Sequence, residues 1–181
     1  IPALDPKVLD LVTEISKEPK VEAAMAFIKD QTEVAMQEQI ELCEIEAPTF
    51  HEEKRAASVA ERMKQYGLTD VHIDEIGNVI GIRKGTGSGP VLAIGAHMDS
   101  VFPAGTDVKV KKEGNIYRAP GIGDNCSGLR ALLQVLRAME KEDISTVGDI
   151  WVVGTVGEEG NGDIRGSKHL CANNKLDGFV A

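Results

Sequence analysis

The stretch VLAIGAHMD, Val91–Asp99, decides the fold. It opens on a continuous apolar run, as expected of a strand that is covered on both faces. Ile150–Val156 is a second run of this kind, and 178–181 begins a third. A helical pattern from about Cys126 to Lys141 joins the first two runs, and 166–173 predicts a helix before the third. This βαβαβ order predicts an α/β fold with a mostly parallel sheet flanked by helices.

The helix before the second strand carries most of the predicted core on that side of the sheet. Its inward face is expected to comprise Leu129, Leu132, Leu133, Val135, Leu136 and Met139.

Helix signals also fill the N-terminal part of the chain. Asp5-Pro6 supplies a cap residue and a proline in the first turn, and Pro19 ends this helix. A second helix is expected from about Val21 to Ile45.

The segment 49–83 predicts a third helix and then two strands. Thr49 and Glu52 have the spacing of a capping box, in which each side chain accepts a hydrogen bond from the other residue's backbone N–H. The helix that follows is expected to stop at Gly67. Strands at 71–76 and 78–83 then flank a turn.

Composition narrows the class of protein. The chain has 181 residues, enough for one domain with a sizeable core, and its net charge of −9 argues against binding to nucleic acid or an anionic membrane surface. No apolar run approaches the roughly 20 residues of a membrane-spanning helix.

Cys43, Cys126 and Cys171 are odd in number and widely spaced, which predicts no disulfide framework. A cytoplasmic location is favoured, and a periplasmic or secreted one stays open because Ile1–Ala3 lacks an initiator methionine.

Acidic motifs lie where the predicted strands end. His97 and Asp99 follow the first buried strand, and Glu158 and Glu159 follow the second. Asp124 stands just before the helix that links them. Because open α/β sheets bind ligands at the carboxyl ends of their strands, we expect these five side chains to converge on one edge.

Imidazole and carboxylates without thiolate suit Zn²⁺, with Co²⁺ or Mn²⁺ as alternatives. His97 can supply a nitrogen ligand, Asp124 can bridge two ions, and Glu159 can hold the second ion. Asp99 can accept the other N–H of His97 and fix its tautomer. Glu158 then remains as a general acid and base.

Plainer interpretations exist for each of these residues. Glu158-Glu159 could be a solvated acidic loop, and His97 a satisfied core histidine. Asp124 could be a simple N-cap, or both a cap and a bridging ligand. Arg165 could bind a substrate carboxylate or form a structural ion pair.

The remaining histidines and cysteines are given structural roles. Surface or cap positions are expected for His51, His72 and His169. Cys126 is expected to be a packed residue in the first turn of its helix, and core or near-core positions are expected for Cys43 and Cys171.

Taken in register, the motifs resemble the first half of an M20-type metallopeptidase, in the group of peptidase T, carboxypeptidase G2, aminoacylase 1 and acetylornithine deacetylase. The similarity runs from Ala47–Phe50 to Gly162–Ser167. It implies a zinc-exopeptidase-like catalytic domain with two zinc ions per complete site. His97 would bind one ion, Asp124 would bridge, and Glu159 would bind the other. It also gives Glu158 the acid/base role, makes Asp99 the residue that orients His97, and implies a cis peptide between Asp124 and Asn125.

The same resemblance divides the chain into two parts. Residues 1–46 would be N-terminal helices that pack on the catalytic domain, and 47–181 the N-terminal part of that domain. The family's lid or dimerisation domain, a further acidic ligand and a final histidine are not found; Asp163 and Asp177 are the only carboxylates after the Glu pair. We therefore expect this form of the chain to bind metal poorly and to be inactive.

Three classes of function follow. The first is a metal-dependent exopeptidase, an aminopeptidase, dipeptidase or carboxypeptidase acting on small peptides. An N-acyl-amino-acid amidohydrolase is the alternative within that family, and a non-catalytic fragment is the second class. A nucleotide-binding domain is disfavoured because no Gly-x-Gly-x-x-Gly opens a helix after a strand. Expected partners are a small peptide or N-acyl amino acid, no nucleic acid, no membrane, and a homodimer in the full-length protein.

Overall fold

The computed structural model describes residues 5–181, so the expectation for Ile1–Ala3 lies outside the described residues. Its main sheet has five strands in the order β1-β2-β6-β3-β7. β3 lies parallel to both β6 and β7, whereas β2 lies antiparallel to β6 and to β1. The predicted α/β class is confirmed, with the correction that the sheet is mixed. The strands span Thr69–Ile73 (β1), Val79–Arg83 (β2), Leu92–His97 (β3), Ile150–Thr155 (β6) and Gly178–Val180 (β7).

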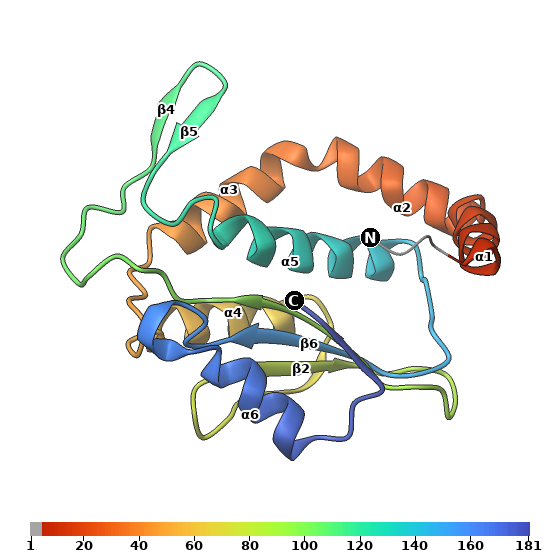
Figure 1. The fold of residues 1–181 in the computed structure, drawn as a ribbon. Coiled ribbons are helices and arrows are strands. Elements are labelled where there is room, and N and C mark those ends of the chain that lie inside the picture. The colour runs from red at the N-terminus through yellow and green to blue at the C-terminus, as the bar shows by residue number, and fades with distance from the viewer. Residues whose placement is uncertain (1–4) are drawn as a thin grey trace.

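Helices cover both faces of this sheet, as Figure 1 shows. α4 (Glu53–Gln65) and α5 (Cys126–Lys141) pack on one face, and α6 (Arg165–Asn173) packs on the other. The larger core lies under α4 and α5, and most of the inward face predicted for α5 is buried there. Val135 is an exception, because it is 40% exposed and points away from the sheet side of the helix.

The N-terminal helices form an outer layer. They are α1 (Pro6–Ser16), α2 (Pro19–Asp30) and α3 (Thr32–Cys43). α2 and α3 both contact α5. The prediction of a single helix from Val21 to Ile45 is wrong, because the helix is interrupted at Gln31. The Thr32 hydroxyl donates to the Lys29 carbonyl, and such a local bond competes with the helical backbone.

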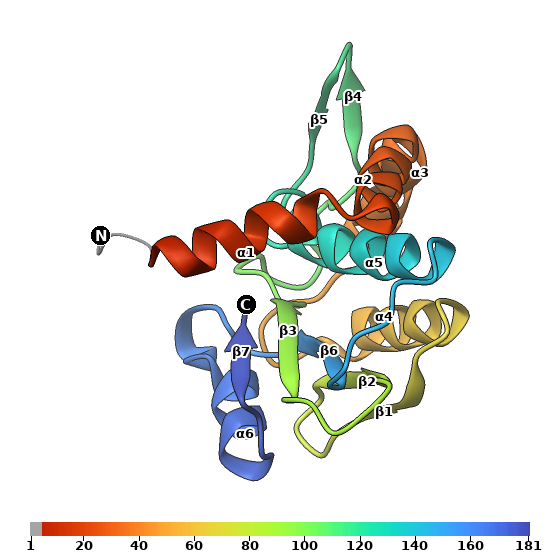
Figure 2. The same ribbon diagram turned by 90° about the vertical axis from the view of Figure 1, so that its right-hand side faces the viewer.

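α1 begins as predicted, with the Asp5 carboxylate accepting a hydrogen bond from the Lys7 backbone N–H. It buries no residue, and Figure 2 shows it crossing the outside of the molecule. Its apolar face is exposed and consists of Val8, Leu9, Leu11, Val12 and Ile15. Among residues 5–181, no helix is long and apolar enough to cross a membrane.

A second, two-stranded sheet was not predicted. It consists of β4 (Lys111–Glu113) and β5 (Ile116–Arg118), and it projects away from the main sheet (Figure 2). Its strands are short and mostly charged, so no alternating apolar pattern marks them in the sequence.

Candidate metal centre

The topology brings the acidic motifs to one edge of the sheet. His97 is the last residue of β3 and pairs in parallel register with Thr155, the last residue of β6. The loop that carries Glu158 and Glu159 therefore leaves the sheet beside the segment that carries Asp99. Asp124 reaches the same edge because α5 starts at Cys126 and packs on β3.

Three of the predicted ligands form one group. His97, Asp124 and Glu159 each offer a ligand atom, and these atoms lie within 4.8 Å of one another. His97 Nε2 is 3.0 Å from Asp124 Oδ1 and 3.8 Å from Glu158 Oε2. Glu158 thus lies next to the group but outside it, as the prediction of an acid/base role requires.

Asp99 lies beneath this group and is fully buried. Its Oδ1 is 3.5 Å from His97 Nδ1, on the opposite side of the ring from Asp124. The same carboxylate also accepts hydrogen bonds from the backbone N–H groups of Glu158 (2.9 Å) and Glu159 (3.0 Å) and from the Thr49 hydroxyl (2.9 Å). Asp99 therefore holds the glutamate loop as well as the histidine.

Burial and neighbouring charges shift the pKa values of His97, Asp99 and Glu159. Burial of the His97 ring lowers its pKa, but Asp99, Glu158 and Asp124 outweigh burial and raise it to about 9. Burial likewise opposes ionisation of Asp99, yet the hydrogen bonds from His97 and the two glutamate N–H groups bring its pKa down to about 2. The pKa of Glu159 is raised, first by burial and then by the charge of Asp124. The group therefore carries more negative charge than its one imidazole can neutralise.

The predicted capping box is wrong. Thr49 bonds to Asp99 instead of capping α4, and the Glu52 side chain turns inward, where it is only 3% exposed. The Glu52 carboxylate accepts a hydrogen bond from the Gly157 N–H at 2.9 Å and forms an ion pair with Arg165 at 3.1 Å. Of the two roles considered for Arg165, the structural ion pair is the one present. Three consecutive backbone N–H groups, from Gly157 to Glu159, are thus held by buried carboxylates.

Arg55 is a further support that the sequence analysis missed. It is 1% exposed, and its guanidinium donates to the backbone carbonyls of Met98 (2.7 Å) and Ile45 (2.6 Å). It thereby ties α4 to the residue just before Asp99. A signal existed in the sequence, because Arg55 shares the apolar helix face of Val59.

The start of α5 corrects a second expectation. Asn125, not Asp124, caps the helix, and its side chain accepts a hydrogen bond from the Gly128 N–H at 3.0 Å. The Asp124 side chain is left free to face His97. The peptide bond between Asp124 and Asn125 is cis, as the family resemblance implied.

Other residues considered from the sequence lie outside the group. Asp163 pairs with Lys168 at 2.7 Å, and Asp177 accepts a hydrogen bond from the Val91 N–H. His169 Nε2 lies 3.0 Å from Glu75 Oε1. Cys171 is exposed, contrary to the prediction of a core position, whereas Cys43 and Cys126 are buried.

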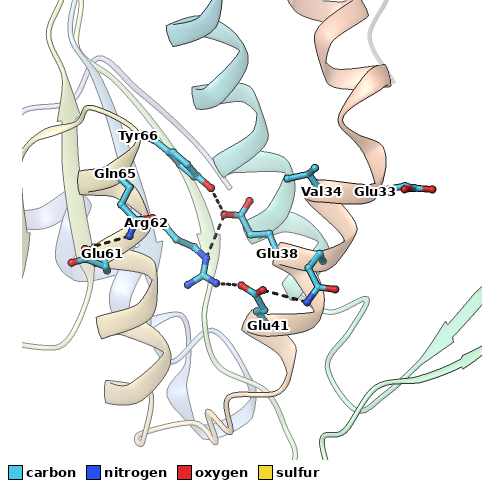
Figure 3. Close-up of a pocket in the computed structure, with 9 residues that line it drawn as sticks. Glu33, Val34, Glu38, Glu41, Glu61, Arg62, Gln65 and Tyr66 are labelled. Atoms are coloured by element: carbon cyan, nitrogen blue, oxygen red, sulfur yellow. Dashed lines mark hydrogen bonds and ion pairs between the residues drawn. The ribbon is translucent and has the colours of Figure 1, made fainter.

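A second set of carboxylates lies between α3 and α4, in a cavity of about 600 Å³ (Figure 3). Glu38 and Glu41 lie on α3 and point toward Arg62 of α4 and Tyr66, the residue that follows α4. Arg62 forms ion pairs with Glu38 at 3.3 Å and with Glu41 at 2.7 Å, and the Tyr66 hydroxyl donates to Glu38 at 2.6 Å. These contacts join two helices, and the carboxylates have cationic or hydroxyl partners.

An imidazole and carboxylates at the carboxyl ends of the strands of an α/β sheet form a group that could hold a metal ion. Residues 93–181 match the model of peptidase family M20/M25/M40. The resemblance found in the sequence is thus confirmed.

Similar proteins support the same assignment. A relative from Pyrococcus abyssi that carries the name LysW-lysine/LysW-ornithine hydrolase is 34% identical over 120 residues, which are 66% of this chain and 32% of the relative. A Staphylococcus aureus tripeptidase has a similar structure, with a TM-score of 0.66 and 30% identity over 80% of this chain and 41% of its own. The aminopeptidase PepT of Bacillus cereus shares the fold, with a TM-score of 0.69 and 23% identity over 82% of this chain and 43% of its own. The chain spans about a third of the length of the curated relatives it matches.

Proposed function

We propose that the protein hydrolyses amide bonds in small peptides with a water molecule activated by two metal ions. The observation that carries this proposal is the convergence of ligand atoms from His97, Asp124 and Glu159 within 4.8 Å. An imidazole with carboxylates, surrounded by further negative charge, fits Zn²⁺, and Co²⁺ or Mn²⁺ would also suit it. Ions of this type polarise a substrate carbonyl and lower the pKa of water when they are bound.

The residues would divide the work as follows. His97 would hold one ion, Glu159 would hold the other, and Asp124 would supply a ligand to both. Asp99 keeps the His97 ring oriented with Nε2 toward the ions. Glu158 takes a proton from the attacking water and returns it to the leaving amine, since it lies beside the group without belonging to it.

Peptides are the favoured substrates because the similar solved structures include a tripeptidase and an aminopeptidase. N-acyl amino acids are the alternative class of substrate. The similarity to the relative named as a LysW-lysine/LysW-ornithine hydrolase supports this alternative. Both substrates present an amide bond to the same site, so the proposed chemistry is common to them.

We further propose that the 181-residue chain on its own is inactive. The described residues bring three ligand side chains together, whereas each catalytic zinc ion usually has three protein ligands of its own.

Metal content and hydrolysis test this proposal together. The chain is dialysed against zinc, its metal content is measured by elemental analysis, and di- and tripeptides and N-acyl amino acids are assayed over long incubations. Glu158→Ala should keep the wild-type metal content and lose whatever turnover exists, whereas His97→Ala should lose metal. A wild-type chain without bound zinc would overturn the metal site, and loss of metal in Glu158→Ala would make Glu158 a ligand.

A further inference from the structure

The β4–β5 hairpin contains an unfavourable pair of charges. Lys111 and Arg118 are directly opposite each other in its antiparallel register. Such partners share one face, with their Cβ atoms about 5 Å apart, and like charges in these positions repel. A repulsion of this kind would be relieved by an anion bound between the two side chains.

Neighbouring residues compensate this charge only in part. Glu113 lies 3.6 Å from Arg118, but both side chains are more than 60% exposed, so the pair contributes little. Lys111 has no ion pair within residues 5–181. The next cross-strand pair is favourable, since the Lys112 ammonium lies 5.1 Å from the centre of the Tyr117 ring. Lys111 and Arg118 thus leave positive charge that is compensated only in part, in a chain whose net charge is −9.

That face borders a cavity. Lys111 and Arg118 line a space of about 590 Å³, together with Phe102, Tyr117 and Ile122. This volume is in the range of small-molecule sites, which are mostly apolar with a few polar groups that fix orientation. Asp107 and Lys109, which is paired with Glu44, also line the cavity. The cavity thus combines an apolar wall with more cationic than anionic groups, which suits a small organic acid better than an inorganic ion.

The cavity adjoins the candidate metal centre. Phe102 follows Asp99 by three residues, and Ile122 precedes Asp124 by two. Phe102 also lines a second cavity, of about 330 Å³, to which Glu159 contributes. Phe102 is therefore common to the cationic cavity and to a cavity that one of the candidate metal ligands lines.

We propose that this cavity is a substrate subsite that recognises a carboxylate through Lys111 and Arg118. The inference rests on the proposed function, because it takes the molecule cleaved at the metal centre to extend into the cavity. The carboxylate is either the C-terminus of a peptide or an acidic side chain, and the chemistry of recognition is the same for both.

Four dipeptides distinguish a C-terminal carboxylate from a side-chain carboxylate: Ala-Glu, Ala-Gln, and the C-terminal amide of each. Binding to the zinc-dialysed and the zinc-free chain is measured by NMR titration. Peptides with a carboxylate should bind the wild type about fivefold more tightly than Ala-Gln amide, as expected for an exposed charge contact of about 1 kcal/mol. Tighter binding of Ala-Gln than of Ala-Glu amide assigns the site to the C-terminus, and the reverse assigns it to the side chain. Equal binding of all four peptides overturns the proposal.

Lys111→Gln should abolish the preference for a carboxylate, whereas the control Lys141→Gln, at the exposed end of α5, should retain it. Lys111→Glu adds a readout that general damage to the hairpin would not produce. It replaces the repulsive pair by an attractive one, so hydrogen exchange of the hairpin amides should slow while the preference is lost. Retained preference in either Lys111 variant, or faster exchange in Lys111→Glu, contradicts the inference.

Failure of this inference and failure of the proposed function are distinguishable. Zinc binding without a carboxylate preference removes the subsite and leaves the metal centre. A carboxylate preference in a chain that binds no zinc removes the metal centre and leaves the subsite.

Discussion

The two carboxylate clusters of this molecule differ in what neutralises them. Between α3 and α4, Glu38 and Glu41 face the guanidinium of Arg62, and Tyr66 donates to Glu38 (Figure 3). At the edge of the sheet, the carboxylates around His97 have that single imidazole as their cationic partner within residues 5–181. The first cluster contains its own cationic partner and joins two helices. The second lacks positive charge, which is what a metal ion would supply.

The candidate metal centre is held in place by buried residues that are not themselves the candidate ligands. The residues that hold the candidate metal centre from below, Asp99, Glu52 and Arg55, are 3% exposed or less. Each accepts from or donates to backbone groups, so the ligand loops are held in place without using the ligands themselves. This division between buried supports and free ligands is what the following experiments test.

The largest expected effect is that of zinc on thermal stability. Ligand at 100 times its dissociation constant stabilises a protein by about 2.7 kcal/mol, which for a chain of this size raises Tm by roughly 5–10 °C. His97→Ala should remove most of this rise. Glu38→Gln is the matched control and should keep it, as measured by calorimetry with and without zinc. If the rise in Tm with zinc depended on Glu38 and not on His97, zinc would bind at the cluster between α3 and α4 instead.

Asp99→Asn should weaken zinc binding by about 10- to 100-fold, because the partner of a metal-binding histidine is lost. It should also lower the free energy of unfolding by about 1–3 kcal/mol, since an amide cannot accept from both glutamate N–H groups. Zinc titration and urea unfolding measure the two effects. Unchanged zinc affinity would show that Asp99 serves the fold alone.

Glu38→Ala should lower the free energy of unfolding by about 1–3 kcal/mol, because Tyr66 and Arg62 lose a buried acceptor. Zinc affinity should not change. Urea unfolding of the metal-free chain, followed by zinc titration, checks both parts. A loss of zinc affinity similar to that of Asp99→Asn would mean that the two clusters are coupled.

The smallest effect concerns alkaline pH. Burial, and then the hydrogen bond to Glu38, raise the pKa of Tyr66 from 10 to about 12. The folded state therefore holds this proton more tightly than the unfolded state, so the contribution to stability is complete below pH 10 and is lost as pH rises toward 12. Tyr66→Phe should lose less stability than the wild type between pH 9 and pH 11 in urea unfolding. An equal loss in both proteins would show that Tyr66 does not contribute.

Much of the fold could be predicted from local pattern. The bounds expected for α5, Cys126 to Lys141, agree with the structure because a long apolar period of 3.6 residues is a strong signal. The break at Gln31 was missed because it depends on one hydroxyl contact at Thr32, and the charged β4–β5 hairpin was missed because it has no apolar alternation.

The ligand residues could be predicted for a different reason. Parallel strands end at the same edge of a sheet, so knowing the strands was enough to bring His97, Asp124 and Glu159 near one another. The supports could not be predicted in this way. Glu52 and Arg165 are 113 residues apart in the chain, and Arg55 and Met98 are 43 apart.

The sequence by itself determined the class of fold, the edge at which the acidic motifs meet and the donor atoms available there, because these depend on periodicity and on strand direction. Only the tertiary structure decided which carboxylates are already compensated. It pairs Glu52 with Arg165 and Glu38 with Arg62, and it leaves the group around His97 with excess negative charge. The physical reason is that charge compensation acts over a few ångströms in space between residues far apart in the chain, which local sequence patterns do not report.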